Sequence, residues 1–339
     1  MESIMRILAF ESSCDETAAA VLERKDGKIT VLSNIVASQV AIHAKFGGVV
    51  PEIASRAHSE AISGITYEAL ETAGVTMDDI DAVAVTNNPG LIGALLVAVN
   101  FAKSLAYSYD KPLIPVNHIK GHIAANYICH PELKAPFIAF VASGGHTSIV
   151  RVEDPITHTL IGGTRDDAMG ESFDKVARVM GMPYPGGAAM DKLAYEGKNP
   201  MKFPSAAIRD DSLDFSFSGI KTAVLNTLNQ MAQKGEEVPR ADIAAGFTSA
   251  AVSSVITKLG MAFDRNPDMQ ALVLAGGVAA NSHLRTALEK FAKKRKISLY
   301  MPELCYCGDN AAMIGAAAFF EWDAGNLADV SLNAYAYSV

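Results

Sequence analysis

The sequence is poor in cysteine and in positive charge, and each shortage excludes a class of protein. Four cysteines in 339 residues are too few and too scattered for a disulfide-stabilised domain, and no pair has the C-x-x-C spacing of a structural zinc site. Asp and Glu outnumber Lys and Arg by 37 to 29, which gives a formal net charge of −8. Such a chain is no general nucleic-acid coat, because phosphate binding needs many cations. A nucleic-acid substrate would require a local basic surface or a basic partner.

Long hydrophobic runs and the common nucleotide-binding motifs are also missing. The longest apolar stretch, around Leu91–Phe101, is too short and too marked by glycine and asparagine to span a bilayer. The N-terminal run Met1–Phe10 is followed at once by acidic residues rather than by a signal-peptide cleavage site. We therefore expect a cytoplasmic protein without a membrane partner. The absence of G-x-G-x-x-G and G-x-x-x-x-G-K-[ST] excludes the Rossmann and P-loop classes.

What the chain does contain is a repeated α/β pattern. Half of its residues are hydrophobic, which is enough for one or two full cores, and strands alternate with helices. The apolar run Ile7–Phe10 leads through a polar turn to Ala18–Leu22. In the same way, Phe137–Ala142 leads through a glycine turn to Ser148–Val152. Both patterns predict a β-hairpin with a tight polar tip.

Two further pairs of elements follow these hairpins in the same order. The strand–loop–helix pattern of Asp81–Tyr107 matches that of Gln270–Lys294. A strand that leads to a final helix begins at Pro112, with a helix containing His122, and again at Ile297, with the helix Ala311–Trp322. We therefore predict a duplicated domain with halves at 1–133 and 134–339. The excess segment 162–245 is predicted to be a mostly helical insertion that covers the cleft between the halves.

The strongest chemical signal is the pair of histidines in His118-Ile-Lys-Gly-His122. Residues at i and i+4 share a helix face, so both imidazoles can bind one metal ion. Asp309 lies at the equivalent loop–helix junction of the other half, which favours a His-His-Asp site over two surface histidines. Such a site leaves coordination positions open and accepts Zn²⁺ or Fe²⁺. Thiolates of the nearby Cys305 and Cys307 remain alternative ligands.

The same spacing occurs in the zinc-peptidase motif H-E-x-x-H, so a metallopeptidase acting on glycoproteins is one alternative. Ile119 stands where that motif has its general base, so this class lacks its proton-transfer group. A second alternative is a nucleotide-dependent regulator without catalytic turnover. A nucleotide clamp has no need of the two histidines and Asp309, which favours an enzyme.

Two glycine loops and an acidic cluster complete the candidate site. Ser143–Thr147 and Gly276–Asn281 would let backbone N–H groups approach a phosphate. Asp15 and Glu16 lie at the tip of the first hairpin and are candidates for proton transfer. Asp166 precedes a predicted helix beginning at about residue 168, and we expect it to cap that helix.

Taken in order, these motifs resemble the TsaD family of bacterial and organellar tRNA threonylcarbamoyl transferases, once labelled O-sialoglycoprotein endopeptidases. The resemblance runs nearly end to end. It rests on ESSCDET at 11–17, GGVVPEIASRAH at 47–58, HIKGH at 118–122, VASGGHT at 141–147, TRDDAMGESFDK at 164–175, FSFSGIKT at 215–222, GGVAAN at 276–281 and DNAAM at 309–313.

The resemblance implies the acetate-kinase/Hsp70/actin superfamily fold, with two RNase-H-like halves, and one divalent metal ion on His118, His122 and Asp309. Fe²⁺ is favoured by the family and Zn²⁺ is the alternative. The implied substrate contacts are Val141, Ala142, Ser143, Gly144, Gly145, Asp174, Gly187, Asp191 and Asn281. The chain departs from the archaeal and eukaryotic relatives, which have glutamate at Asp191 and a tyrosine ligand at Val141, and from many bacterial members, which have threonine at Gly308.

The implied reaction transfers the threonylcarbamoyl group from threonylcarbamoyl-AMP to the exocyclic amine of a tRNA adenosine. That adenosine lies immediately 3′ of the anticodon in tRNAs reading codons that begin with A. Asp15 and Glu16 would orient the amine or take its proton. The implied partners are TsaB and TsaE, with TsaC supplying the adenylate, and we expect a heterodimer through a helical face of the first half.

Overall fold

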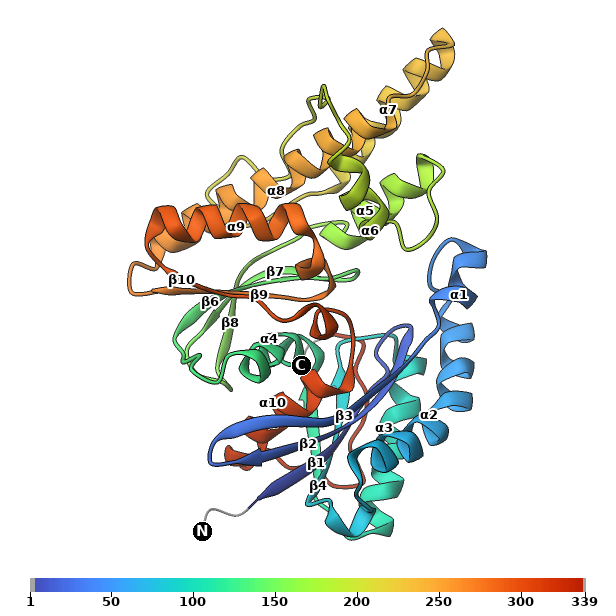
Figure 1. Ribbon diagram of the computed structural model, residues 1–339, viewed down its shortest axis with the longest axis vertical. Helices are drawn as coiled ribbons and strands as arrows, with labels where there is room; N and C mark the ends of the chain where they lie inside the picture. The colour runs from blue at the N-terminus through green and yellow to red at the C-terminus, as the bar shows by residue number, and fades with distance from the viewer. Residues whose placement is uncertain (1–3, 338–339) are drawn as a thin grey trace. The chain divides into compact units, whose positions relative to one another are not determined.

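Two five-stranded mixed sheets organise the chain. The computed structural model describes residues 4–337 and divides them into two units (Figure 1). The first unit lies within Met1–Ala135, Asp154–Thr157 and Pro302–Val339, and the second comprises Pro136–Glu153 and His158–Met301. The sequence-based division placed 302–339 in the second half, and the structure corrects it. Helix α10 (Ala311–Asp323) packs on the first sheet, where its small and apolar residues join the core.

The first sheet has the strand order β3-β2-β1-β4-β5. Its strands are β1 (Met5–Glu11), β2 (Glu16–Lys25), β3 (Lys28–Ser38), β4 (Ala82–Asn88) and β5 (Leu113–Asn117). Strand β1 pairs antiparallel with β2 and parallel with β4, and β4 pairs parallel with β5. Since β1, β4 and β5 run in one direction, their carboxyl ends meet at one edge of the sheet.

Helices cover both faces of this sheet. Alternate residues of β1 separate the two cores: Leu8 and Phe10 pack with helices α2 (Pro51–Ala73) and α3 (Ile92–Ser108), whereas Ile7 and Ala9 pack with α4 (His118–Cys129) and α10. Glycine allows the last two helices to approach closely. A Cβ at Gly121 would lie 2.7 Å from Cδ1 of Ile314. The remaining short elements are α1 (Val40–His43), η1 (Ala44–Phe46), η2 (Met77–Asp79) and η4 (Leu304–Tyr306).

The second sheet repeats the first one. Its order is β10-β9-β6-β7-β8, with β6 (Phe137–Ala142), β7 (Thr147–Val152), β8 (His158–Gly163), β9 (Ala271–Ala275) and β10 (Ser298–Tyr300). Strand β6 pairs antiparallel with β7 and parallel with β9, as β1 pairs with β2 and β4. The predicted duplication and α/β class are therefore confirmed. The third strands, β3 and β8, were not predicted.

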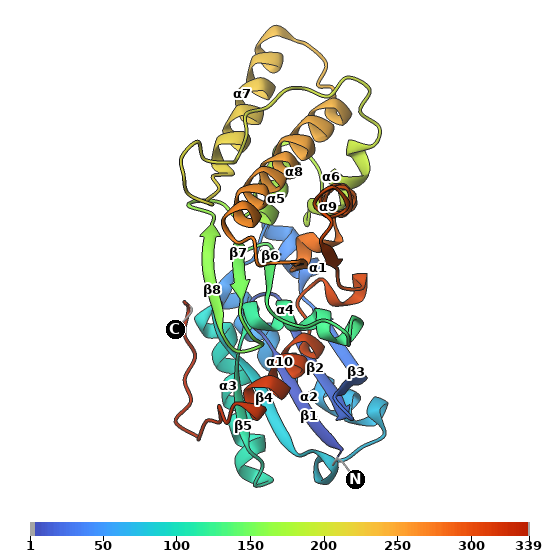
Figure 2. The same ribbon diagram turned by 90° about the vertical axis from the view of Figure 1, so that its left-hand side faces the viewer.

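The helices of the second unit include the predicted insertion. They are α5 (Met169–Val179), α6 (Gly187–Ala194), α7 (Ser218–Lys234), α8 (Arg240–Arg265), η3 (Gly277–Ala280) and α9 (Ser282–Arg295). Figure 2 shows α7 and α8 at one end of this unit. Helix α8 runs through the predicted insertion boundary at 245. By length and composition alone α8 passes the test for a membrane span, but 72% of its apolar window is buried inside the protein, as in a core helix.

Candidate metal centre and substrate loops

Three potential metal ligands converge in the first unit. Helix α4 begins at His118 because the Asn117 side chain accepts hydrogen bonds from the backbone N–H groups of Ile119 and Lys120. His118 and His122 therefore face the same way, with ring centroids 4.6 Å apart. Oδ1 of Asp309, which directly precedes the Asn310 cap of α10, lies 3.1 Å from Nε2 of His122 and 3.6 Å from Nε2 of His118. The predicted set thus comes together, with its ligand atoms within 4.8 Å of one another.

The surroundings of His122 fit a cation. Both of its ring nitrogens are buried and form no hydrogen bond within residues 4–337, although the Asp309 carboxylate is close. A buried nitrogen without a hydrogen bond costs free energy, and a metal ion bound to Nε2 would offset this cost for that atom. Burial also lowers the pKa of His122, so the imidazole is neutral, and the neutral form is the one that binds metals.

Behind His118 lies a carboxylate whose role the sequence reasoning missed. Oε2 of Glu11, at the end of β1, lies 3.0 Å from Nδ1 of His118 and accepts a 2.6 Å hydrogen bond from Oγ1 of Thr86. Burial opposes charge on both partners, but their mutual attraction lowers the pKa of Glu11, and with Asp309 it raises the pKa of His118 to about 9. The signal in the sequence was positional: Glu11, Thr86 and His118 stand at the carboxyl ends of three neighbouring strands.

The two acidic residues of the first hairpin turn are buried more deeply than their charge suggests. Asp15 is 8% exposed, and Oε1 of Glu16 accepts a hydrogen bond from Ser38. Burial, and then the charges of Asp309 and Asp15, raise the pKa of Glu16 to about 9. The turn therefore offers a carboxyl group, that of Glu16, which holds a proton at neutral pH in the metal-free protein.

The first glycine loop lies in the second unit, between β6 and β7. Val141 and Ala142 are fully buried strand residues, so only their backbone can reach a ligand. The turn closes through a hydrogen bond from the Ser143 N–H to the His146 carbonyl, and Gly144 and Gly145 are exposed at its tip. This arrangement leaves the glycine backbone free for close approach by an anion.

The second glycine loop, which follows β9, lies beside the end of β6, the strand that leads into the first glycine loop. Gly276 has a φ of +90°, and a Cβ there would be 2.4 Å from the carbonyl oxygen of Ala142. Only glycine fits this position, so the β9 loop is fixed against the end of β6. Asn281 then caps α9, with its side chain accepting a hydrogen bond from the Leu284 N–H. The two predicted loops are therefore neighbours.

The other predicted substrate residues organise the ends of α6 and α9. Oδ1 of Asp174 accepts hydrogen bonds from the N–H groups of Gly186 and Gly187 at 2.7 and 3.2 Å. Asp191 accepts hydrogen bonds from the backbone and hydroxyl of Ser282, next to Asn281. Burial favours the neutral form of Asp191, but hydrogen bonds from His283 and Ser282 lower its pKa. Asp191 is therefore an ionised anchor that connects α6 to the cap of α9.

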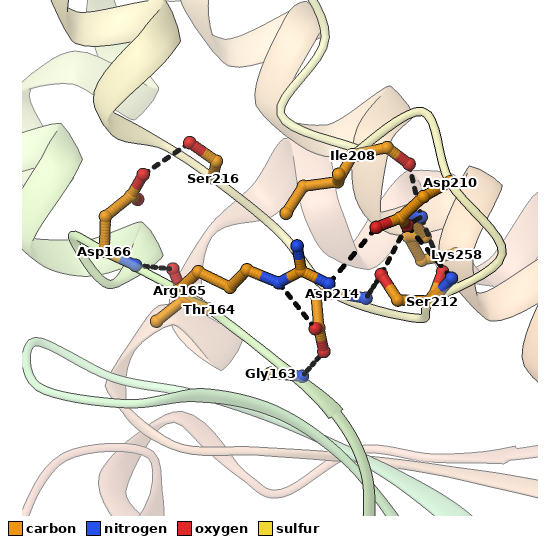
Figure 3. Close-up of polar contacts among 10 residues, drawn as sticks. All are labelled: Gly163, Thr164, Arg165, Asp166, Ile208, Asp210, Ser212, Asp214, Ser216 and Lys258. Atoms are coloured by element: carbon orange, nitrogen blue, oxygen red, sulfur yellow. Dashed lines mark hydrogen bonds and ion pairs between the residues drawn. The ribbon is translucent and has the colours of Figure 1, made fainter.

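Asp166 caps a different helix from the one predicted. Its Oδ1 accepts hydrogen bonds from the N–H groups of Phe217 and Ser218. Its Oδ2 accepts one from the Ser216 hydroxyl, and Figure 3 shows this contact. Asp166 thus satisfies the start of α7, about fifty residues further along the chain, rather than that of α5. The prediction was wrong because a local sequence pattern cannot show which helix start lies nearest in space.

The irregular segment between α6 and α7 is held in place by buried and exposed charged side chains. Nζ of Lys258, whose side chain is 1% exposed, donates hydrogen bonds to the carbonyls of Ile208 and Ser212 at 2.6 and 2.7 Å (Figure 3). Arg165 pairs with Asp214 at 2.8 Å. These contacts hold the irregular segment between α6 and α7 against β8 and α8.

Asp167 gives a testable pH dependence. It joins α5 to α7, with its carboxylate 2.7 Å from Nζ of Lys175 and 2.6 Å from Nζ of Lys221. Burial opposes ionisation, but the two lysines lower its pKa. A lowered folded-state pKa contributes stability above the unfolded-state pKa, and this stability is lost as pH falls through the folded-state value. We expect Asp167→Asn to reduce the free energy of unfolding by about 1 kcal/mol at neutral pH, and by progressively less as the pH falls below the ordinary aspartate pKa of about 3.9.

Urea unfolding of both proteins across this pH range measures the difference. Asp211→Asn is the matched control, because Asp211 is exposed and should show no such dependence. Equal destabilisation by Asp167→Asn at all pH values would contradict the assigned ion pairs.

Comparison with known proteins gives one consistent family. The model of the family TsaD, described as tRNA N6-adenosine threonylcarbamoyltransferase, matches residues 30–316. A protein of that name from Clostridium perfringens is 57% identical over 329 residues, covering 97% of this chain and 96% of the relative. Another from Clostridium novyi is 55% identical over 337 residues, covering 98% and 97%.

Solved structures agree on the fold. Component A of the (R)-2-hydroxyglutaryl-CoA dehydratase from Acidaminococcus fermentans superposes with a TM-score of 0.56 at 14% identity, covering 94% of this chain and 98% of its own. HypF from T. kodakarensis superposes with a TM-score of 0.60 at 14% identity, covering 97% and 49%. At such low identity these similarities show a shared fold, in agreement with the predicted fold class.

Proposed function

Because the chain belongs to the TsaD family, we propose that it transfers the threonylcarbamoyl group from threonylcarbamoyl-AMP to the exocyclic amine of the adenosine 3′ of the anticodon, in tRNAs that read codons beginning with A. Relatives of that name that are 52–57% identical over nearly the whole chain support this function. The observation that carries it is the convergence of His118, His122 and Asp309, since a peptidase would also need a base at Ile119.

The transfer is a substitution at a carbonyl carbon. The amine nitrogen of the adenosine forms a bond to the carbamoyl carbon of the mixed anhydride, the bond from that carbon to the phosphate oxygen breaks, and AMP leaves with the electron pair. The amine loses one proton. We assign the orientation of the amine and the uptake of this proton to the Asp15 and Glu16 pair, with Asp15 as the base.

We assign one divalent metal ion to His118, His122 and Asp309, with Fe²⁺ favoured and Zn²⁺ as the alternative. When bound, it would act as a Lewis acid toward the oxygens of the anhydride. The two imidazoles and the carboxylate leave coordination positions for a reactant.

The AMP part is assigned to the loops of the second unit. Backbone N–H groups of Gly144 and Gly145 would donate to the phosphate, while the buried Val141 and Ala142 hold the strand end in place. Asn281 has amide N–H donors left over after its cap, because the cap uses only the side-chain oxygen. We assign the rest of the substrate site to Asp174, Gly187 and Asp191, whose hydrogen bonds hold the starts of α6 and α9.

Partners follow from charge and exposure. A chain with a net charge of −8 should bind tRNA weakly alone, so we propose that it acts with TsaB and TsaE, and that TsaC supplies the adenylate, in the cytoplasm. Helices α2 and α3 display Tyr67 and Tyr107, which are 76% and 79% exposed. Exposed aromatic residues suit an interface, and we assign the TsaB contact to this helical face.

A reconstituted reaction tests the function. Purified protein is combined with the adenylate-forming and partner proteins, threonine, bicarbonate, ATP and tRNA, and the nucleosides are analysed by mass. We expect modified adenosine, and we expect Asp15→Ala to reduce its rate of formation by about 100-fold, because a general base contributes at least that much. Asp211→Ala is the control.

Each outcome separates the alternatives. Cleavage of a glycoprotein without tRNA modification would favour the peptidase, and nucleotide binding without turnover would favour the regulator. Full activity in Asp15→Ala would remove Asp15 from the proton-transfer role while leaving the reaction itself in place.

A further inference from the structure

We propose that Glu11 is a positioning residue that holds the ring of His118 in the orientation and tautomer required of a metal ligand. This inference depends on the metal site assigned above. Both oxygens of the Glu11 carboxylate have polar partners. Oε1 accepts the N–H of Ser13 at 2.5 Å, and Oε2 accepts the Thr86 hydroxyl at 2.6 Å and faces Nδ1 of His118 at 3.0 Å. The side chain is fully buried, so these contacts alone fix it.

The geometry assigns the proton of the imidazole. A carboxylate can only accept a hydrogen bond, so Nδ1 of His118 must carry the proton that it shares with Glu11. Ser13 Oγ is a second polar neighbour of this nitrogen, at 3.2 Å. In the neutral ring the lone pair is then on Nε2, the atom that faces Asp309. Glu11 therefore orients Nε2 toward Asp309 before any ion binds, and an ion that binds to Nε2 would displace the proton that the charged ring carries there.

Charge supports the same role. Glu11 and Asp309 contribute two negative charges to a site where both histidines are buried. A divalent cation would neutralise this pair of carboxylates, and a carboxylate behind a ligand histidine also increases the basicity of that ligand. With only one carboxylate, a buried divalent ion would leave an unbalanced positive charge.

His122 provides an internal contrast. Within the described chain its Nδ1 has no hydrogen-bond partner, so packing between α4 and α10 must orient it. Of the two histidines, only His118 has a carboxylate at its Nδ1 within the described residues. Removal of that carboxylate should therefore affect the site through His118 and leave the position of His122 unchanged.

The fold explains why Glu11 can reach His118. Strands β1 and β4 are parallel and pair Phe10 with Val85, so the next residues, Glu11 and Thr86, lie side by side. Strand β5 continues directly into α4 at His118. Three adjacent strand ends thus supply the acceptor, the hydroxyl donor and the ligand.

The test measures metal binding rather than activity alone. Wild type and Glu11→Gln are titrated with Zn²⁺, and anaerobically with Fe²⁺, by calorimetry with chelator competition. We expect one ion per chain in both proteins, with an affinity about 10- to 100-fold lower in Glu11→Gln, the usual effect of losing such a contact. Glu23→Gln is the control, because Glu23 pairs with Arg6 away from the ligands.

Nitrogen NMR of labelled histidine gives an independent readout. At a pH above the His118 pKa of about 9, where the ring is neutral, we expect His118 of the metal-free wild type to carry its one proton on Nδ1, and we expect this preference to weaken in Glu11→Gln. If that variant does not fold, Thr86→Val removes only the hydroxyl donor and should weaken binding in the same direction. Unchanged affinity and an unchanged His118 spectrum would overturn the proposal. A wild type that binds no metal would instead refute the metal site itself.

Discussion

Replacing Asp309 by alanine is expected to abolish metal binding and to reduce threonylcarbamoyl transfer by more than about 100-fold, since the loss of a mere supporting contact costs up to that much. Asp309 is the ligand nearest both imidazoles and the only carboxylate in the set. The fold should survive, because Asn310 rather than Asp309 caps α10. Elemental analysis of the purified protein and nucleoside mass analysis of the reaction products measure the two effects.

The matched control is Asp323→Ala, at the opposite end of the same helix. Asp323 pairs with Arg24 on β2 and lies far along α10 from the candidate ligands. It should retain metal and activity. An Asp309→Ala protein that kept one metal ion and the wild-type rate would remove Asp309 from the site.

Gly276→Ala is expected to destabilise the second unit by about 3 kcal/mol or more and to cause loss of adenylate binding. Two costs combine: a side chain at a φ of +90° is strained, and its Cβ would lie 2.4 Å from the Ala142 carbonyl, which belongs to the strand leading into the first glycine loop. Relief of this clash must move one predicted loop away from the other. Urea unfolding and calorimetry with a non-hydrolysable adenylate analogue measure the two effects.

Gly277→Ala is the control for this prediction. A Cβ at Gly277 would have no other atom within 4 Å, so the added methyl group meets open space. This variant should unfold like the wild type. Equal stability of both variants would show that the β9 loop is not held against β6.

The repeated part of the fold was predictable because both halves carry the same local signals. Hairpins with polar tips and strand–loop–helix units occur in the same order, and the two sheets have equivalent pairings. The assignment of 302–339 was not predictable in this way. Helix α10 is apolar on nearly every side, so its sequence shows that it is buried but not which sheet it packs on.

The candidate site was predictable where spacing alone decides the geometry. His118 and His122 share a helix face at any position in space, and Asp309 was found through the internal repeat. Glu11 could not be assigned a role, because its partner belongs to a strand end more than one hundred residues away. The prediction for Asp166 was wrong for the same reason. The N–H groups that donate to its carboxylate are brought to it only by the tertiary structure.

The most direct test of the metal site is anomalous diffraction from crystals of the protein loaded with Fe²⁺ or Zn²⁺, recorded on both sides of the absorption edge of the metal. The assignment predicts one peak in the first unit, at about 2.0–2.2 Å from Nε2 of His118, Nε2 of His122 and a carboxylate oxygen of Asp309. A peak on the cysteine residues, or no peak near these three side chains, would contradict it.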